Sequence, residues 1–174
     1  RKRDRPFFLM CHHKAPHRAF EPKPEHFALW QGTHVNVPQT FDDDYKNRAR
    51  AASAAKMRVV ADLTYEDPGL VQPEGGASVG EPLVAGSTVR KVPDWTDVSQ
   101  VELRDRNTGE AFRFDSAEAL RQFKYQRYIK RYLATVHSID ENVGRILDWL
   151  DDNGSAANTI VIYTSDQGFF LGDH

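Results

Sequence analysis

The chain has 174 residues, of which 40% are hydrophobic and 28% charged, and its formal net charge is −2. This composition fits one globular domain or a large piece of one. The small net charge argues against broad electrostatic binding of nucleic acid or anionic membranes. The lack of an apolar run of about 18 residues predicts no membrane-spanning helix.

The first expected element is a strand over residues 6–12, a short apolar run that follows a basic cluster. A continuous apolar run of this length is typical of a strand buried on both faces of a parallel sheet. Cys11, the single cysteine, lies in this run and is expected to be a buried free thiol. The chain opens on Arg1 without an initiator Met or a signal-peptide pattern, so we expect that processing or truncation has removed its start.

Residues 13–40 contain four prolines and are predicted to form an ordered loop, because proline fixes φ and removes a backbone donor. Three aspartates at 42–44 precede an Ala-rich stretch that ends near Met57, which predicts a capped helix. The aspartates lack the spacing of an EF-hand calcium loop. Residues 66–97 are rich in Pro and Gly and are expected to be irregular, and residues 98–114 alternate around an Asn/Gly turn as in a β-hairpin.

The strongest pattern predicts a helix over residues 116–152. Asp115 and Glu118 have the spacing of a capping box at its start, and Asn153-Gly154 marks its end. Apolar residues recur at alternating steps of four and three, which keeps one face buried. They are Tyr132, Val136, Ile139, Val143, Ile146 and Leu150.

A second apolar strand is expected over residues 159–164. The order strand, long helix, strand predicts an α/β fold with a mostly parallel sheet flanked by helices. Polar residues follow both strands, at 12–14 and 165–168. Because ligand sites in such sheets lie beyond the carboxyl ends of the strands, these residues predict one site.

The residue types at this predicted site suit an anion and a metal ion. Asp166 and Gln167 offer the oxygen ligands that Ca²⁺ and Mg²⁺ prefer, although Asp-Gln-Gly is also an ordinary turn. Lys14 supplies a positive charge and His17 can donate a proton near neutral pH. A zinc site of His12, His13 and His17 is disfavoured, because Pro16 breaks helical spacing there.

Together the two motifs resemble those of the type I sulfatases, members of the alkaline-phosphatase superfamily. The resemblance covers residues 6–18, the helix segment 138–145 and residues 158–174, and it is weakest over 64–114, which is expected to be a variable insertion. It implies an alkaline-phosphatase-like α/β fold. Among sulfatases, the motif pair is most similar to enzymes that act on sulfated glycans, including N-acetylglucosamine-6-sulfatases.

The resemblance implies a role for each motif residue. Asp166 and Gln167 match the second pair of ligands of a single divalent ion, usually calcium and less often magnesium. His17 matches the histidine that protonates the leaving oxygen, and Lys14 matches a substrate contact. His174 matches a residue that shapes the substrate pocket.

The resemblance also implies parts that this sequence lacks. Type I sulfatases use a formylglycine nucleophile, made from Cys or Ser in a Cys/Ser-x-Pro/Ala-x-Arg motif, and neither Cys11 nor any Ser fits it. The first aspartate pair of the metal site and a later lysine are also missing. We therefore expect an inactive fragment, the C-terminal part of a catalytic domain, with sheet edges that promote association.

Two other functions fit the same residues. A phosphatase or phosphodiesterase of the same superfamily is one, although Gln167 favours the one-metal sulfatase site. A non-catalytic domain that binds an anionic glycan is the other. The family is usually periplasmic, secreted or lysosomal, and the oligomeric state is not readable from the sequence.

Overall fold

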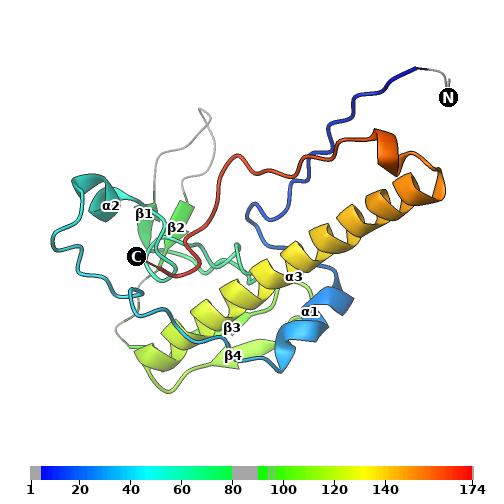
Figure 1. Ribbon diagram of the computed structural model, residues 1–174. Helices are drawn as coiled ribbons and strands as arrows, with labels where there is room; N and C mark the ends of the chain where they lie inside the picture. Colours follow the sequence, from blue (N-terminus) through cyan, green and yellow to red (C-terminus); the bar gives the residue numbers. More distant parts are fainter. Residues whose placement is uncertain (1–4, 80–89, 94, 96, 174) are drawn as a thin grey trace.

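A computed structural model describes residues 5–79, 90–93, 95 and 97–173 (Figure 1). A long helix, α3, runs through the molecule, and the other elements lie along it. In chain order the elements are α1 (Pro24–Gln31), α2 (Arg50–Ala54), β1 (Ala77–Val79), β2 (Arg90–Val92), β3 (Glu102–Arg104), β4 (Ala111–Arg113), α3 (Ala117–Asp152) and the 3-10 helix η1 (Ala156–Asn158).

Helix α3 confirms the helix expected over residues 116–152. Its N-terminus is capped differently from the expectation, because the hydroxyl oxygen of Ser116 accepts from the Ala119 amide at 3.1 Å. The predicted capping box of Asp115 and Glu118 is therefore wrong, since Ser116 is the residue in extended conformation at the cap position. The chain leaves the helix at Gly154, whose φ of 60° suits glycine.

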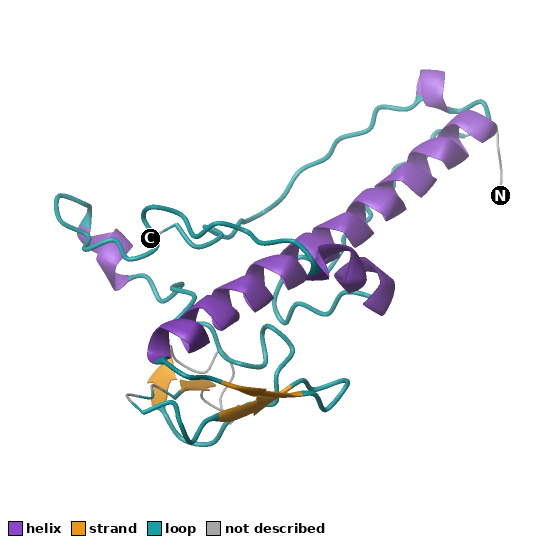
Figure 2. Ribbon diagram, turned by 90° about the horizontal axis from the view of Figure 1, so that it is seen from below, coloured by secondary structure: helices purple, strands orange, loops and turns teal. Residues whose placement is uncertain are grey.

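The expected hairpin over residues 98–114 is also confirmed. Strands β3 and β4 pair antiparallel, with Leu103 opposite Phe112, and Figure 2 shows the hairpin beside the first turns of α3. Its inner face contributes to a first core that also takes in Leu120 of α3. Because residues between 65 and 114 supply most of this core, the segment packs as part of the body. Its status as a variable insertion stays a prediction.

A second core lies along the middle of α3 and is aromatic. Phe20, which is fully buried, meets Tyr128 edge-on with ring centroids 5.4 Å apart. The core is completed by side chains that are far apart in sequence, and its buried members are Phe20, Val59, Leu63, Tyr125, Tyr128 and Ile129. Burial of the phenol raises the pKa of Tyr128, so this hydroxyl stays protonated.

A charged group is buried between the two cores. Asp105, 6% exposed, accepts hydrogen bonds from Arg127 and, at 3.4 Å, from Arg131, and from the amides of Asn107 and Thr108. Burial alone would raise its pKa, but these donors together lower the pKa of Asp105 to about 2. Burial and the neighbouring Arg127 lower the pKa of Arg131 to about 10.

The two apolar segments predicted as parallel strands are not strands among the described residues. Residues 6–12 and 159–164 run extended, and their side chains face outward: Phe8 is 87% exposed and Ile160 is 90% exposed. The predicted burial of Cys11 is likewise wrong, because its thiol is exposed. The physical reason is that a strand needs a ladder partner, and the described part of the chain gives these segments none. The α/β class itself stands, with antiparallel two-stranded sheets.

Two helical predictions need correction near the start of the chain. Residues 13–40 were expected to lack a helix, yet α1 forms there with Pro24 in its first turn, the position where proline costs no hydrogen bond. The helix expected from residue 42 shrinks to α2, because Asp43 and Asp44 bond the amides two residues on and form turns instead. None of the helices in the described ranges is long and apolar enough to cross a bilayer.

Candidate functional site

The Lys14–His17 motif forms a tight turn in which the His17 amide donates to the Lys14 carbonyl at 3.0 Å. Both side chains reach the carbonyl oxygen of Arg18, His17 through Nδ1 at 2.5 Å and Lys14 through Nζ at 3.3 Å. A carbonyl oxygen only accepts, so Nδ1 carries the hydrogen in this arrangement. Nε2 is then the ring nitrogen of the exposed His17 that is left to exchange a proton with a ligand.

The second motif presents oxygen atoms to solvent. Asp166 and Gln167 are both exposed, and the Ser165 hydroxyl donates to the Gln167 backbone carbonyl at 2.6 Å. The carboxylate and amide oxygens have the chemistry that a hard cation prefers. They are two donors, whereas calcium takes about six to eight. The fit to calcium is therefore right in donor type and partial in number.

The two motifs are anchored on one aromatic cluster. Phe20 follows His17 closely in sequence and Phe169 follows Gln167 closely, and their ring centroids lie 5.5 Å apart at an interplanar angle of 70°. Tyr132 of α3 packs edge-on against both rings, with centroids 6.0 Å away in each case. Segments more than a hundred residues apart in the chain thus attach to the same point of α3.

The end of the described chain is fixed beside a polar pocket. The Thr40 hydroxyl donates to the Asp173 carboxylate, and Gly172, at φ 102°, lies where a Cβ would come within 2.8 Å of the Tyr125 ring. The pocket beside them holds two arginines, each of which already contacts a carboxylate: Arg58 with Asp62, and Arg121 with Asp42. His174, predicted to shape a substrate pocket, lies outside the described residues.

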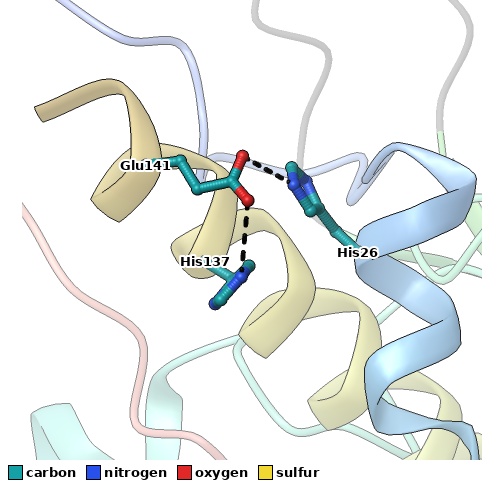
Figure 3. Close-up of side chains that lie close together, drawn as sticks. All are labelled: His26, His137 and Glu141. Atoms are coloured by element: carbon teal, nitrogen blue, oxygen red, sulfur yellow. Dashed lines mark hydrogen bonds and ion pairs between the residues drawn. The ribbon is translucent and has the colours of Figure 1, made fainter. Parts of the chain in front are cut away.

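A cluster that the sequence did not predict lies between α1 and α3 (Figure 3). His26, buried on α1, points its Nε2 at Glu141 Oε2 at 2.8 Å, and His137 lies 3.6 Å from the other carboxylate oxygen. The only early sign was that His137 and Glu141 are four residues apart on a helix. His26 gave no sign, because it lies in a segment predicted as loop.

The chain matches the sulfatase family model over residues 1–174. It is 35% identical over 181 aligned residues to the N-acetylglucosamine-6-O-sulfatase of Bacteroides thetaiotaomicron, an alignment that covers 100% of this chain and 31% of that protein. It is 47% identical over 51 residues to the human iduronate 2-sulfatase, covering 29% of this chain and 9% of that protein.

A solved structure shares the fold as well as the sequence. It is a protein in complex with its substrate D-glucosamine-2-N,6-O-disulfate, with a TM-score of 0.57 and 30% identity, and the match covers 92% of this chain and 33% of that one. The present chain therefore spans about a third of the length of these two full-cover matches.

Proposed function

The chain belongs to the sulfatase family, and we propose that it supplies part of the active site of an enzyme that hydrolyses a sulfate monoester of a sugar. The observation that carries this proposal is the aromatic anchor of Phe20 and Phe169, which attaches both polar motifs to the same part of α3. A general acid and two metal ligands are useful to one reaction only if they face one substrate, and a shared anchor supports that arrangement.

His17 acts as the general acid in this proposal. The leaving oxygen of a sugar sulfate is a poor leaving group, and a proton delivered to it typically accelerates such a step by about 10²–10⁴-fold. With Nδ1 held on the Arg18 carbonyl, Nε2 is the atom that delivers the proton. Lys14, tied to the same carbonyl by its ammonium group, lies close to this histidine and contacts the anionic substrate.

Asp166 and Gln167 would hold one side of a divalent cation, with calcium preferred over magnesium. When bound, the ion supplies positive charge against the sulfate oxygens. The remaining ligands are not among these two residues, and no residue of the chain fits the Cys/Ser-x-Pro/Ala-x-Arg motif that formylglycine requires. The proposal therefore assigns the nucleophile and the other ligands to a different part of the protein.

The substrate class follows from the relatives. Two matches that cover nearly the whole chain carry names that specify 6-O-sulfated glucosamine derivatives, so we propose a 6-sulfated N-acetylglucosamine or glucosamine unit of a glycan. His174 would help shape the pocket for it. A periplasmic, secreted or lysosomal location would suit such a substrate.

The test uses the complete protein that contains this chain. Sulfate release should be measured from N-acetylglucosamine 6-sulfate and from p-nitrophenyl sulfate, whose leaving group needs little protonation. His17→Ala should lower kcat on the sugar by about 10²–10⁴-fold and much less on the aryl ester. His13→Ala, an exposed histidine beside the motif, is the matched control and should leave both rates within a few-fold.

Each other outcome decides against a specific part of the proposal. Equal losses on both esters would remove His17 from the role of acid. Release of phosphate from the matched phosphate ester, with none of sulfate, would favour the phosphatase of the same superfamily. Binding of the sulfated sugar without turnover of either ester would favour the glycan-binding domain.

A further inference from the structure

The cluster of His26, His137 and Glu141 joins two helices through three metal-ligating side chains. Their nearest ligand atoms all lie within 4.8 Å of one another, and Figure 3 shows the three side chains converging from α1 and α3. We propose that these residues bind a zinc-class transition-metal ion that fastens α1 to α3. This site is separate from Asp166 and Gln167 and does not rest on the proposed sulfatase activity.

Hydrogen-bond bookkeeping shows that the cluster lacks a positive charge. The Ser138 hydroxyl donates to the Ala134 carbonyl at 3.2 Å, so its oxygen accepts from His26 Nδ1 at 2.5 Å. That leaves the lone pair of a neutral His26 at Nε2, facing the Glu141 carboxylate oxygen at 2.8 Å. Two electron-rich atoms at this distance repel unless a cation, either a proton or a metal ion, lies between them.

A metal ion answers this need with the ligands present. Zinc takes imidazole nitrogen and carboxylate oxygen at about 2.0–2.2 Å, so donors of a tetrahedral ion lie about 3.3 Å apart. The two distances from the Glu141 carboxylate to the imidazoles, 2.8 and 3.6 Å, lie on either side of that value. Small side-chain rotations would therefore seat an ion.

The surroundings also suit a transition metal rather than calcium. Two of the three donors are imidazole nitrogens, which calcium does not favour. His26 is 4% exposed, and Ser138 orients it through the nitrogen that does not face the ion, as an outer-shell partner does. His137 and Glu141 are partly open to solvent, which gives an entry path and leaves room for water in a fourth position.

The experiment is a Zn²⁺ titration of the chain against a chromophoric chelator, with Co²⁺ absorption as a second readout of coordination. We expect one tight Zn²⁺ per chain and a rise in Tm of about 5–10 °C when free Zn²⁺ is about a hundred times Kd. Ca²⁺ should produce no such rise. Co²⁺ should give the intense d–d bands of a four- or five-coordinate site.

Variants identify the ligands. His137→Gln and Glu141→Gln change partly exposed side chains, so both should fold, and each should weaken Zn²⁺ binding by about 100-fold or more; Ser138→Ala should weaken it by about 10-fold. The matched control is His12→Gln with His13→Gln, two exposed histidines outside the cluster, which should bind normally. The proposal is overturned if no tight Zn²⁺ binds, if the ligand variants bind like the parent, or if the control variant loses binding.

Discussion

Two regions of this molecule reverse the usual placement of polar and apolar side chains. Asp105, Arg127 and Arg131 are charged and buried, whereas Phe8 and Ile160 are apolar and almost fully exposed. The charged group is inside because backbone amides and two guanidinium groups satisfy Asp105. The apolar segments are outside because the described chain offers them no neighbouring strand. The comparison teaches that a partner, more than polarity, decides burial here.

The largest expected effect comes from removing Asp105. Asp105→Ala leaves Arg127 and Arg131 as buried charges without their carboxylate, and should lower the free energy of unfolding by about 3–5 kcal/mol. Urea unfolding followed by circular dichroism measures this loss. Arg113→Gln removes a more exposed pair with Glu102 and should cost no more than about 1 kcal/mol. Similar losses in the two variants would mean that burial adds nothing to the Asp105 pairing.

Acid should weaken the same group to a smaller extent. The pKa of Asp105 lies at about 2 in the folded chain against 3.8 for the model carboxyl. Its stabilisation is therefore complete above pH 4 and is lost as the pH falls towards 2, for a total of roughly 2 kcal/mol. Unfolding measured between pH 5 and 2 should fall more steeply in the parent than in Asp105→Asn. Parallel slopes would contradict the pairing.

The smallest effect is expected in the exposed apolar segments. Ile160→Ser should change the free energy of unfolding by less than about 0.5 kcal/mol, because the side chain is already in water. The measurement must be made at low concentration, since exposed apolar strands promote association. Leu103→Ala in the first core, at 2% exposure, is the control and should cost about 2–5 kcal/mol. A loss at Ile160 as large as the control would show that the segment is a buried strand after all.

Elements with strong local signals could be predicted from the sequence. The periodicity of α3 and the turn at Asn107-Gly109 specify the helix and the hairpin through nearby residues alone. Helix α1 escaped prediction because its contacts are with α3, as when His26 meets Ser138 across 112 positions. The burial of Arg127 and Arg131 escaped it for the same reason, since their partner Asp105 lies on the hairpin.

The candidate site divides in the same way. The motif residues His17, Lys14, Asp166 and Gln167 were found from residue types and a family resemblance, and their roles stay predictions. Their shared anchor through Phe20 and Phe169 could not be found, because no local pattern links two rings so far apart in the chain. The parallel-sheet prediction assumed that an apolar run brings its own ladder partner, and residues 159–164 show that it does not.

The length of α3 also sets the order in which the molecule assembles. A 36-residue helix relaxes in about a microsecond because its bonds join near neighbours. The bonds that attach the earlier chain to it span 89 positions from Tyr125 to Asn36 and 111 from Arg131 to Phe20. Closing such loops costs entropy before any contact forms. We expect α3 to serve as an early template, onto which residues 20–63 dock in the slow, rate-limiting phase of refolding.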